Sequence, residues 1–380
     1  MRTIDLFAGC GGMTKGFNNA GFETVAAFEF WDVAVECYAQ NYLHPVLQKD
    51  LSETSKVIPL IKSFNPEVII GGPPCQDFSH AGKRIEADRA NLTMSFAQII
   101  DSIKPKAFVM ENVDRIIDSY TYAKARETYK NAGYGLTALV FDASLCGIPQ
   151  KRKRFFCIGV INEFDGFLKK SLIDKLSSIP TTLKDYFSTA LDFEHYYRHP
   201  RNYSRRAVFS INEPSPTIRG VNRPVPKGYP GHPNDTAQLT GDIRCLTTLE
   251  RALIQTFPAD YKWTGSKTDM EQMIGNAVPV KLAEYVATNL KNHLDSNTNI
   301  FSNETSFLKW LVLTKGYNIR SARDVSSRIR RAIQIHPICD NLAYYIFKLE
   351  QAKDFAVLSS SVRSQIKKAL LLNAEFSLAS

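Results

Sequence analysis

The chain has 380 residues, of which 44% are hydrophobic and 22% charged, a composition that is typical of a globular protein and excludes extensive disorder. No apolar run approaches the roughly 18 residues of a membrane-spanning helix, and the N-terminus lacks the pattern of a secretion signal. The seven cysteines form no CxxC pair. We therefore expect a cytoplasmic protein with no disulfide framework, no zinc site and no membrane association.

The net charge of +9 is concentrated in two segments. Residues 195–227 contain seven basic residues and one acidic residue, and residues 297–380 contain twelve and six. Each segment therefore carries +6, which leaves −3 for the rest of the chain. Two basic segments on a slightly acidic body indicate a polyanionic partner such as a nucleic acid.

The first 160 residues alternate short apolar runs with helical patterns. This alternation is typical of βαβ units, so we expect an α/β fold with a parallel sheet. The expected strands are residues 4–7, 24–28, 46–48, 67–70, 107–110 and 155–160, and the expected helices between them include residues 13–20 and 31–41.

The alternation stops between about residues 165 and 240, where prolines and aromatic residues become frequent and helical periodicity is poor. We expect an irregular, loop-rich segment there. Helical patterns return at residues 249–255 and 280–293. The polar residues 295–299 are expected to be a linker to a helical extension.

The extension has the apolar spacing of packed helices. Ser321 and Asp324 have the spacing of a capping box in front of an apolar face, and Arg323 and Arg330 fall opposite that face. Both arginines are therefore expected to be available to a partner, and the extension is either a helical buttress or an accessory binding module. The apolar positions are Val325, Ile329, Ala332 and Ile333, and later Val362, Ile366, Ala369 and Leu370.

Glycine-rich and acidic segments follow the first three expected strands, at the edge where open parallel sheets bind ligands. The segment from Phe7 to Gly12 has glycines that let the backbone approach a ligand at a helix N-terminus. Glu29 ends the second strand, at a spacing from this loop where a carboxylate typically binds ribose hydroxyls. Together with Asp50 after the third strand, these residues predict a nucleoside pocket. The loop is not GxGxxG, which disfavours a dinucleotide.

A turn after the fourth expected strand places Cys75 directly behind Pro73 and Pro74. The two prolines fix the backbone and leave the thiol little freedom, which favours a nucleophile over a buried structural cysteine. Glu111 follows the fifth strand and is expected to face the same crevice as an acid or base.

In combination these segments resemble the motifs of the DNA cytosine-5 methyltransferase family of the bacterial restriction–modification type. The resemblance runs from Thr3 to about Leu290 and is interrupted by the irregular segment. The matching segments are Asp5 to Gly12, Gly72 to Gln76, Glu111-Asn112-Val113, Gln150-x-Arg152-x-Arg154, and Gly275 to Pro279, which in this family folds back beside the first motif.

The resemblance implies a Rossmann-like domain that binds S-adenosylmethionine as cofactor. Glu29 would bind the ribose, Phe30 would stack on the adenine, and Asp50 would accept from the adenine amino group. The other residues implied at the cofactor site are Phe7, Ala8, Gly9, Gly11, Gly12, Pro73, Asn276 and Val278.

The implied reaction needs a nucleophile, because carbon 5 of cytosine does not by itself attack a methyl sulfonium. The thiolate of Cys75 would add to carbon 6, and Glu111 would protonate or hydrogen-bond N3 of the ring. Arg154 would contact the ring oxygen, and Arg152 would support the site. The base must leave the duplex stack first, and the polar residues 77–91 are expected to close over it.

The implied domains are a catalytic domain (1–165 plus 270–296), a smaller irregular target-recognition domain (166–269) and the helical extension (297–380). At Leu249 and Leu253 the family usually has arginines, which puts the local packing in question. Basic and aromatic residues of the target-recognition domain are candidates to contact DNA, without an assignment of which reads bases. They are Tyr196, Tyr197, Arg198, Arg201, Tyr203, Arg205 and Arg206.

The leading prediction is sequence-specific methylation of cytosine carbon 5 in double-stranded DNA by a monomer. The sequence leaves open the recognition sequence and whether a cognate restriction endonuclease accompanies the enzyme. One alternative is a transfer-RNA cytosine-5 methyltransferase, but the CFTxxY signature of that branch is missing. A second is a non-catalytic regulator that binds DNA or cofactor, although Cys75 and Glu111 are both retained.

Overall fold

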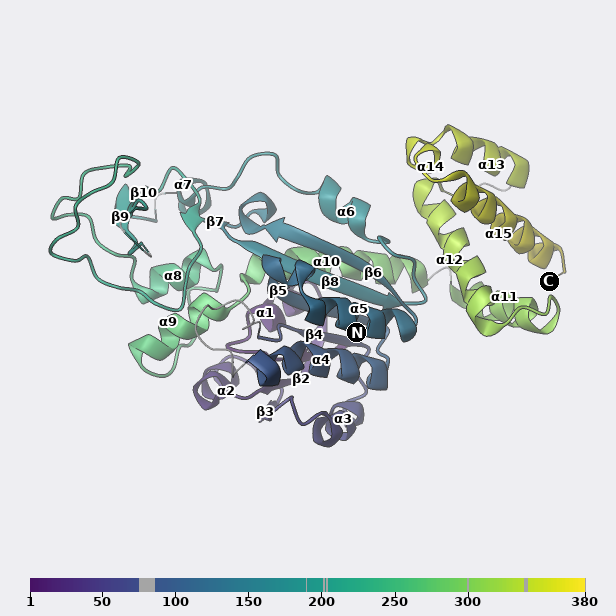
Figure 1. Cartoon of the computed structure of the whole chain (residues 1–380), viewed down its shortest axis with the longest axis horizontal. Coiled ribbons are helices and arrows are strands. Elements are labelled where there is room, and N and C mark those ends of the chain that lie inside the picture. The colour runs from purple at the N-terminus through teal and green to yellow at the C-terminus, as the bar shows by residue number, and fades with distance from the viewer. Residues whose placement is uncertain are drawn as a thin grey trace. The chain divides into compact units, whose positions relative to one another are not determined.

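The computed structural model divides the chain into two compact units, which are described separately (Figure 1). Unit 1 consists of Met1–Ala132, Thr137–Gly159 and Leu168–Lys291, and unit 2 of Gly133–Leu136, Val160–Phe167 and Asn292–Ser380. The structure describes residues 1–74, 86–188, 190–200, 202, 204–298, 301–337 and 341–379.

A seven-stranded sheet forms the centre of the fold, in the order β3-β2-β1-β4-β5-β8-β6. The strands from β3 to β5 pair in parallel, which confirms the expected α/β sheet. The order reverses at β1, which lies between β2 and β4, and ligands bind outside the carboxyl ends of strands at such a switch point. The strands are β1 (Arg2–Leu6), β2 (Glu23–Glu29), β3 (Val46–Gln48), β4 (Val68–Gly71), β5 (Ala107–Val113), β6 (Tyr134–Asp142) and β8 (Lys153–Ile161).

Strands β4 and β5 are buried almost throughout, because helices cover both faces of the sheet (Figure 1). The six expected strands all form, and β3 has the expected bounds. The pattern did not predict β6, although residues 138–141 are apolar, and the C-terminal half of this strand is only partly buried. The helices around the sheet are α1 (Gly12–Asn19), α2 (Asp32–Ala39), α3 (Thr54–Ser63), α4 (Glu86–Ile103), α5 (Tyr120–Asn131) and α10 (Val280–Thr298).

Residues 166–269, called the middle region below, contain little regular structure, as expected. Two small sheets are present, one of β9 with β10 and one of β11 with β7 (Gln150–Lys151). The region shares a hydrophobic core with the loop after β1 and with α2, since Tyr196 and Phe209 belong to the same cluster as Cys10. The short elements are α6 (Lys169–Asp174), α7 (Leu183–Phe187), β9 (His195–Tyr197), β10 (Val208–Ser210), β11 (Ser215–Pro216) and α8 (Thr248–Ile254), followed by α9 (Lys267–Asn276).

Unit 2 has a hydrophobic core of its own, to which the expected apolar positions of the extension contribute. Helix α12 is capped by Asn318, whose side chain accepts from the Ser321 amide, so the predicted capping box at Ser321 and Asp324 is wrong. The helices of the extension are α11 (Phe301–Leu313), α12 (Ile319–Ile335), α13 (Leu342–Gln351), α14 (Lys353–Ala356) and α15 (Ser360–Ala379).

Two further expectations about this part of the chain are corrected. Residues 295–298 belong to α10 and are not a linker, and Asn299 lies outside the described residues. Arg323 is exposed as expected, but Arg330 is 5% exposed. Arg330 lies 3.3 Å from the Glu163 carboxylate and also donates to the Asn162 carbonyl, so it is buried within unit 2 and is not available to a partner. In the described part of the chain, no helix has the length and apolarity to cross a bilayer.

Candidate active site

The loop after β1 turns tightly into α1 through three residues with positive φ, namely Phe7, Gly9 and Gly11. A Cβ atom on Gly11 would lie 2.5 Å from the Tyr42 ring, and one on Gly12 would lie 2.5 Å from the Val278 carbonyl oxygen. Both positions therefore require glycine. The second contact also brings the segment at Val278 beside the loop, as the resemblance implied.

Glu29 connects this loop to the end of β2. One carboxylate oxygen accepts from the Gly9 amide at 2.8 Å, and the other accepts from the amides of Phe30 and Trp31, each at 2.8 Å. The three bonds fix the carboxylate at the carboxyl edge of the sheet, beside the glycine loop.

The residues at this edge fit the nucleoside of S-adenosylmethionine. Phe30 is 67% exposed and offers an open aromatic face, which a buried core residue does not. No atom lies within 4 Å of where a Cβ on Gly9 would be, so there is free space above the loop. Asp50 and Asn276 are exposed and polar, whereas Ala8, Gly12, Pro73 and Val278 are buried.

A second glycine turn lies beside Glu111, at the ends of β4 and β5. A Cβ on Gly72 would be 3.0 Å from a Glu111 carboxylate oxygen. The Asn112 side chain donates to the Pro73 carbonyl at 2.9 Å and so ties this turn to β5. Cys75 and residues 76–85 lie outside the described residues, and residues 86–91 already belong to α4, so the closing loop expected at 77–91 is wrong for its last six residues.

Glu111 is 8% exposed, and its carboxylate lies 3.0 Å from Nε of Arg154. Burial raises the pKa of Glu111 above its ordinary value, and the charges of Arg154 and Arg152 act in the opposite direction. A carboxyl with a raised pKa next to a guanidinium holds its proton to a higher pH than an ordinary glutamate and is placed to donate it.

Arg152 is fully buried. Among the described residues, its guanidinium forms no ion pair with an acidic side chain. It donates instead to the carbonyls of Ile218 (2.9 Å), Gly275 (2.8 Å) and Ala277 (3.0 Å). Together with its own segment, it therefore joins three parts of the chain that are distant in sequence.

Sequence reasoning missed two glutamines that complete this junction. Gln150 accepts from the Ile218 amide at 2.9 Å and donates to Gln255 at 2.7 Å. Gln255 in turn donates to the Ala277 carbonyl at 3.0 Å. Gln150 could have been found from the sequence, because it begins the QxRxR motif. No local pattern marks Gln255.

The model of the C-5 cytosine-specific DNA methylase family matches residues 1–292. The chain belongs to this family. It is therefore a cytosine-5 DNA methyltransferase, and the alternatives of a transfer-RNA enzyme and a non-catalytic regulator are not supported.

The methyltransferase is similar to type II enzymes over almost their whole length. It is 52% identical to M.HindV of Haemophilus influenzae over 294 residues, which cover 77% of this chain and 97% of that protein. It is 53% identical to M.HgiDI of Herpetosiphon aurantiacus over 299 residues, which cover 78% and 96%. The S. pombe Dnmt2 methyltransferase has the same fold, with a TM-score of 0.57 at 19% identity over 77% of this chain and 99% of that one.

In the methyltransferase, two of the three aromatic residues expected to contact DNA from the middle region are part of its core. Tyr196 is 0% and Tyr197 1% exposed, so neither can stack on a base. Arg206 pairs with Glu213, and Arg198 donates to the Thr217 carbonyl at 2.7 Å. Arg205 is exposed, and Arg201 and Tyr203 lie outside the described residues.

The departure from the family at Leu249 and Leu253 does not disrupt α8. Thr247 and Glu250 form a capping box at its N-terminus, and Leu249 is exposed. The arginine of this helix is Arg251, which is buried and pairs with Glu271.

Proposed function

We propose that the enzyme methylates carbon 5 of cytosine within a specific sequence of double-stranded DNA, with Cys75 as the nucleophile. The observation that carries this proposal is the position of Glu111, which is buried, paired with Arg154 and in contact with the turn that leads to Cys75. Asn112 holds Pro73 in that turn, two residues before the thiol.

The cofactor would be held by the glycine loop and by the residues at the ends of β2 and β3. S-adenosylmethionine supplies an electrophilic methyl group when it is bound. Phe30 is proposed to stack on the adenine, Glu29 to accept from the ribose hydroxyls, and Asp50 to accept from the adenine amino group. The support for these roles is the exposed ring of Phe30 and the free space above Gly9.

The proposed chemistry uses the chain's own groups in a fixed order. The Cys75 thiolate adds to carbon 6, and Glu111 delivers its proton to N3, so the ring becomes an enamine that is nucleophilic at carbon 5. Arg154 donates to the ring oxygen, where negative charge develops. After methylation a base removes the carbon 5 proton, the thiolate leaves, and the N3 proton returns to Glu111. A stacked base cannot reach these groups, so we propose that the cytosine is flipped out of the duplex.

The proposal is tested in a host that lacks cytosine methylation. Bisulfite sequencing of its DNA should reveal 5-methylcytosine in one short sequence when the wild-type enzyme is expressed. Cys75→Ser should abolish the signal and keep cofactor binding by calorimetry. Methylation by the serine variant at the wild-type level would contradict the role of the thiol.

A trapping experiment tests the covalent step independently. DNA that contains 5-fluorocytosine at the target should remain attached to the enzyme, because fluorine at carbon 5 cannot leave as a proton. A band of enzyme plus DNA is expected on a denaturing gel for the wild type and not for Cys75→Ser. Absence of the band with an enzyme that methylates normal DNA would contradict covalent catalysis.

We further propose that the enzyme acts as a monomer in the cytoplasm, with a cognate restriction endonuclease as its functional partner. The similarity to type II methyltransferases supports the second point. Size measurement of the enzyme–DNA complex in solution tests the first.

A further inference from the structure

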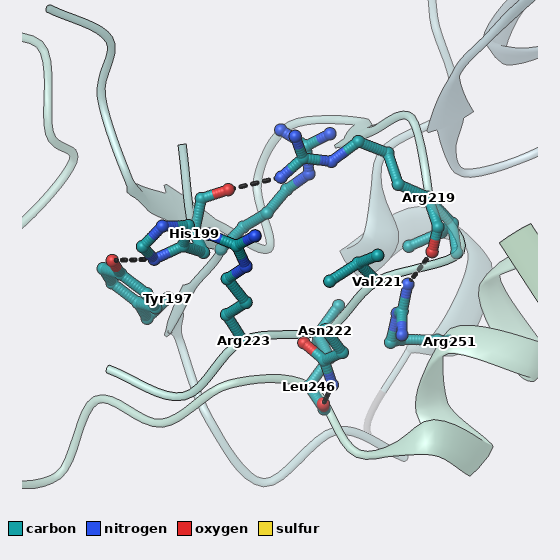
Figure 2. Close-up of a pocket in the computed structure, with 10 residues that line it drawn as sticks. Tyr197, His199, Arg219, Val221, Asn222, Arg223, Leu246 and Arg251 are labelled. Carbon is teal, nitrogen blue, oxygen red and sulfur yellow. Dashed lines mark hydrogen bonds between the residues drawn. The ribbon is translucent and has the colours of Figure 1, made fainter. Parts of the chain in front are cut away.

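A small basic hollow lies in the middle region, and Figure 2 shows it lined by several arginine side chains. Its interior volume is about 20 Å³, which is space for about one water molecule and not for a nucleobase. DNA can therefore meet the rim of this hollow but not enter it. The four arginines that line it are Arg198, Arg219, Arg223 and Arg251.

The segment that forms one wall of the hollow is held firmly from behind. Ile218 is hydrogen-bonded at both its amide and its carbonyl, by Gln150 and by Arg152, each at 2.9 Å. Asn222 donates to the Leu246 carbonyl at 2.9 Å and to Glu271 at 3.2 Å. Both ends of residues 218–222 are thus anchored to the protein interior.

This anchoring determines which side chains face solvent. The Asn222 side chain is turned inward by these hydrogen bonds, while its two neighbours Val221 and Arg223 are on the solvent side. Val221 is 60% exposed and Arg223 is also exposed. Pro224 follows and restricts the backbone of Arg223 to extended conformations. The Arg223 guanidinium is therefore carried by a backbone of restricted geometry, and Figure 2 shows its side chain among those that line the hollow.

The other three arginines have structural partners. Arg198 donates to the Thr217 carbonyl at 2.7 Å, and Arg219 donates to the His199 carbonyl. Arg251 donates to the Arg219 carbonyl and is buried. Among the four, Arg223 is the one with an exposed side chain.

The segment also lies close to the reaction site. Arg152, which holds Ile218, directly precedes β8, the strand whose Arg154 pairs with Glu111. Arg223 follows Ile218 by five residues. A duplex whose target cytosine meets Glu111 would therefore present neighbouring base pairs to the rim.

We propose that Arg223 is a specificity-determining residue that reads a guanine of the recognition sequence through the major groove. The planar fork of a guanidinium matches the O6 and N7 acceptors of guanine, and a fixed backbone is what discrimination between base edges requires. This inference rests on the proposed function, because it takes double-stranded DNA as the substrate.

The test uses the full-length enzyme and the sequence mapped by bisulfite sequencing. Methylation rates are measured on duplexes in which each guanine in turn is replaced by 7-deazaguanine, which lacks the N7 acceptor. At one position the replacement should lower kcat/KM of the wild type on the order of tenfold, as expected for loss of part of a bidentate contact. Arg223→Ala should methylate more slowly and should be insensitive to the replacement at that same position.

Two further variants separate base reading from charge. Arg223→Lys keeps the charge without the fork and should lose the sensitivity as well, whereas Lys227→Ala removes one charge from the same exposed stretch and should keep it. The thermal midpoints of the variants check that they are folded.

Two outcomes would overturn the inference. One is an Arg223→Ala enzyme that keeps the wild-type pattern of sensitivity and is slower on every duplex alike, which is the behaviour of a phosphate contact. The other is a wild-type enzyme for which no guanine replacement matters. A wild type that produces no 5-methylcytosine at all would instead refute the proposed function.

Discussion

The protonation of Glu111 is set by two opposing influences. Burial raises the pKa of its carboxyl, while the charges of Arg154 and Arg152 lower it. The guanidinium of Arg154 is 3.0 Å away, so the site tolerates the charged form after the proton has been given up. An acid that must donate and then remain in place as a carboxylate needs both influences.

Substitution Glu111→Gln should lower kcat by roughly 10²- to 10⁴-fold, because an amide can donate a hydrogen bond to N3 but cannot transfer a proton. The wild type should lose activity as the pH rises through the pKa of Glu111, since only the protonated form donates, and the variant should lack this decline. Methyl incorporation measured against pH checks both points. Glu127→Gln, at an exposed glutamate, is the control. Wild-type rates in Glu111→Gln would remove the acid from the mechanism.

Asp5 is a second buried carboxyl, at the start of the glycine-loop motif. Thr14 donates to it at 2.6 Å, but its other oxygen has no hydrogen-bond partner among the described residues. Burial raises the pKa of Asp5 from 3.8 to about 7. The folded protein therefore binds a proton here that the unfolded chain has already released above pH 4.

The free energy of unfolding should consequently fall as the pH rises from about 4 to about 7, by up to about 4 kcal/mol from this group. Asp5→Asn resembles the protonated acid and should remove most of this decline. Urea unfolding at several pH values measures the pH dependence of the free energy of unfolding. Asp260→Asn, which changes an exposed carboxylate, is the control. An unchanged slope in Asp5→Asn would mean that Asp5 does not dominate the pH dependence.

Close contact between α1 and α10 places the last family motif beside the first. A Cβ on Gly16 would lie 2.5 Å from the Val280 carbonyl oxygen and 2.6 Å from Cβ of Ala283. Gly12 meets the Val278 carbonyl in the same way. The glycines of α1 are thus packing residues, and they determine how near the cofactor loop lies to the segment that closes it.

Gly16→Ala should destabilise the protein by about 1 to 3 kcal/mol, because the contact is with backbone atoms that cannot move aside. Without the contact the same change would stabilise a helix by a fraction of this amount. Gly241→Ala, where nothing lies within 4 Å and φ is not positive, should change the stability by less than about 0.5 kcal/mol. Thermal unfolding compares the two variants. A stabilised Gly16→Ala would show that the helices can separate without cost.

At the scale of the whole molecule, the helical extension is part of a unit with its own core and with two short strand-end segments, Gly133–Leu136 and Val160–Phe167. Arg330 and His293 both approach the Glu163 carboxylate, at 3.3 Å and 3.2 Å. The Glu163 side chain is 0% exposed, so this cluster holds helix and strand end together by buried charge.

Arg330→Ala should destabilise unit 2 by about 3 to 5 kcal/mol, because the Glu163 carboxylate stays buried without this cation. Arg323→Ala, at an exposed arginine of the same helix, should be nearly neutral. Limited proteolysis followed by mass spectrometry should show faster loss of the extension in the first variant only. Equal rates in both would mean that the apolar core alone holds unit 2 together.

The sequence predicted the elements whose signals are local. The strands of the parallel sheet follow from apolar runs, and the candidate residues Glu29 and Glu111 follow from their places at strand ends. The pattern failed where an element is half exposed, as in β6, and where a polar residue is buried by a distant partner, as in Arg330. The prediction that Tyr196 and Tyr197 contact DNA was wrong for the same reason. An aromatic residue beside arginines has the same local sequence pattern in a core as on a DNA-binding surface.

By itself, the sequence determined the order of the strands along the chain, the residues at their carboxyl ends, and hence the family and the class of chemistry. The tertiary structure alone decided which charged side chains are structural and which face solvent. Arg152, Arg251 and Arg330 are buried by carbonyls or acids that are 20 to 168 residues away in the chain. Arg223 is exposed, whereas Asn222 beside it is anchored by Leu246 and Glu271. A guanidinium's partner depends on contacts across the fold, and no local pattern of residues records them.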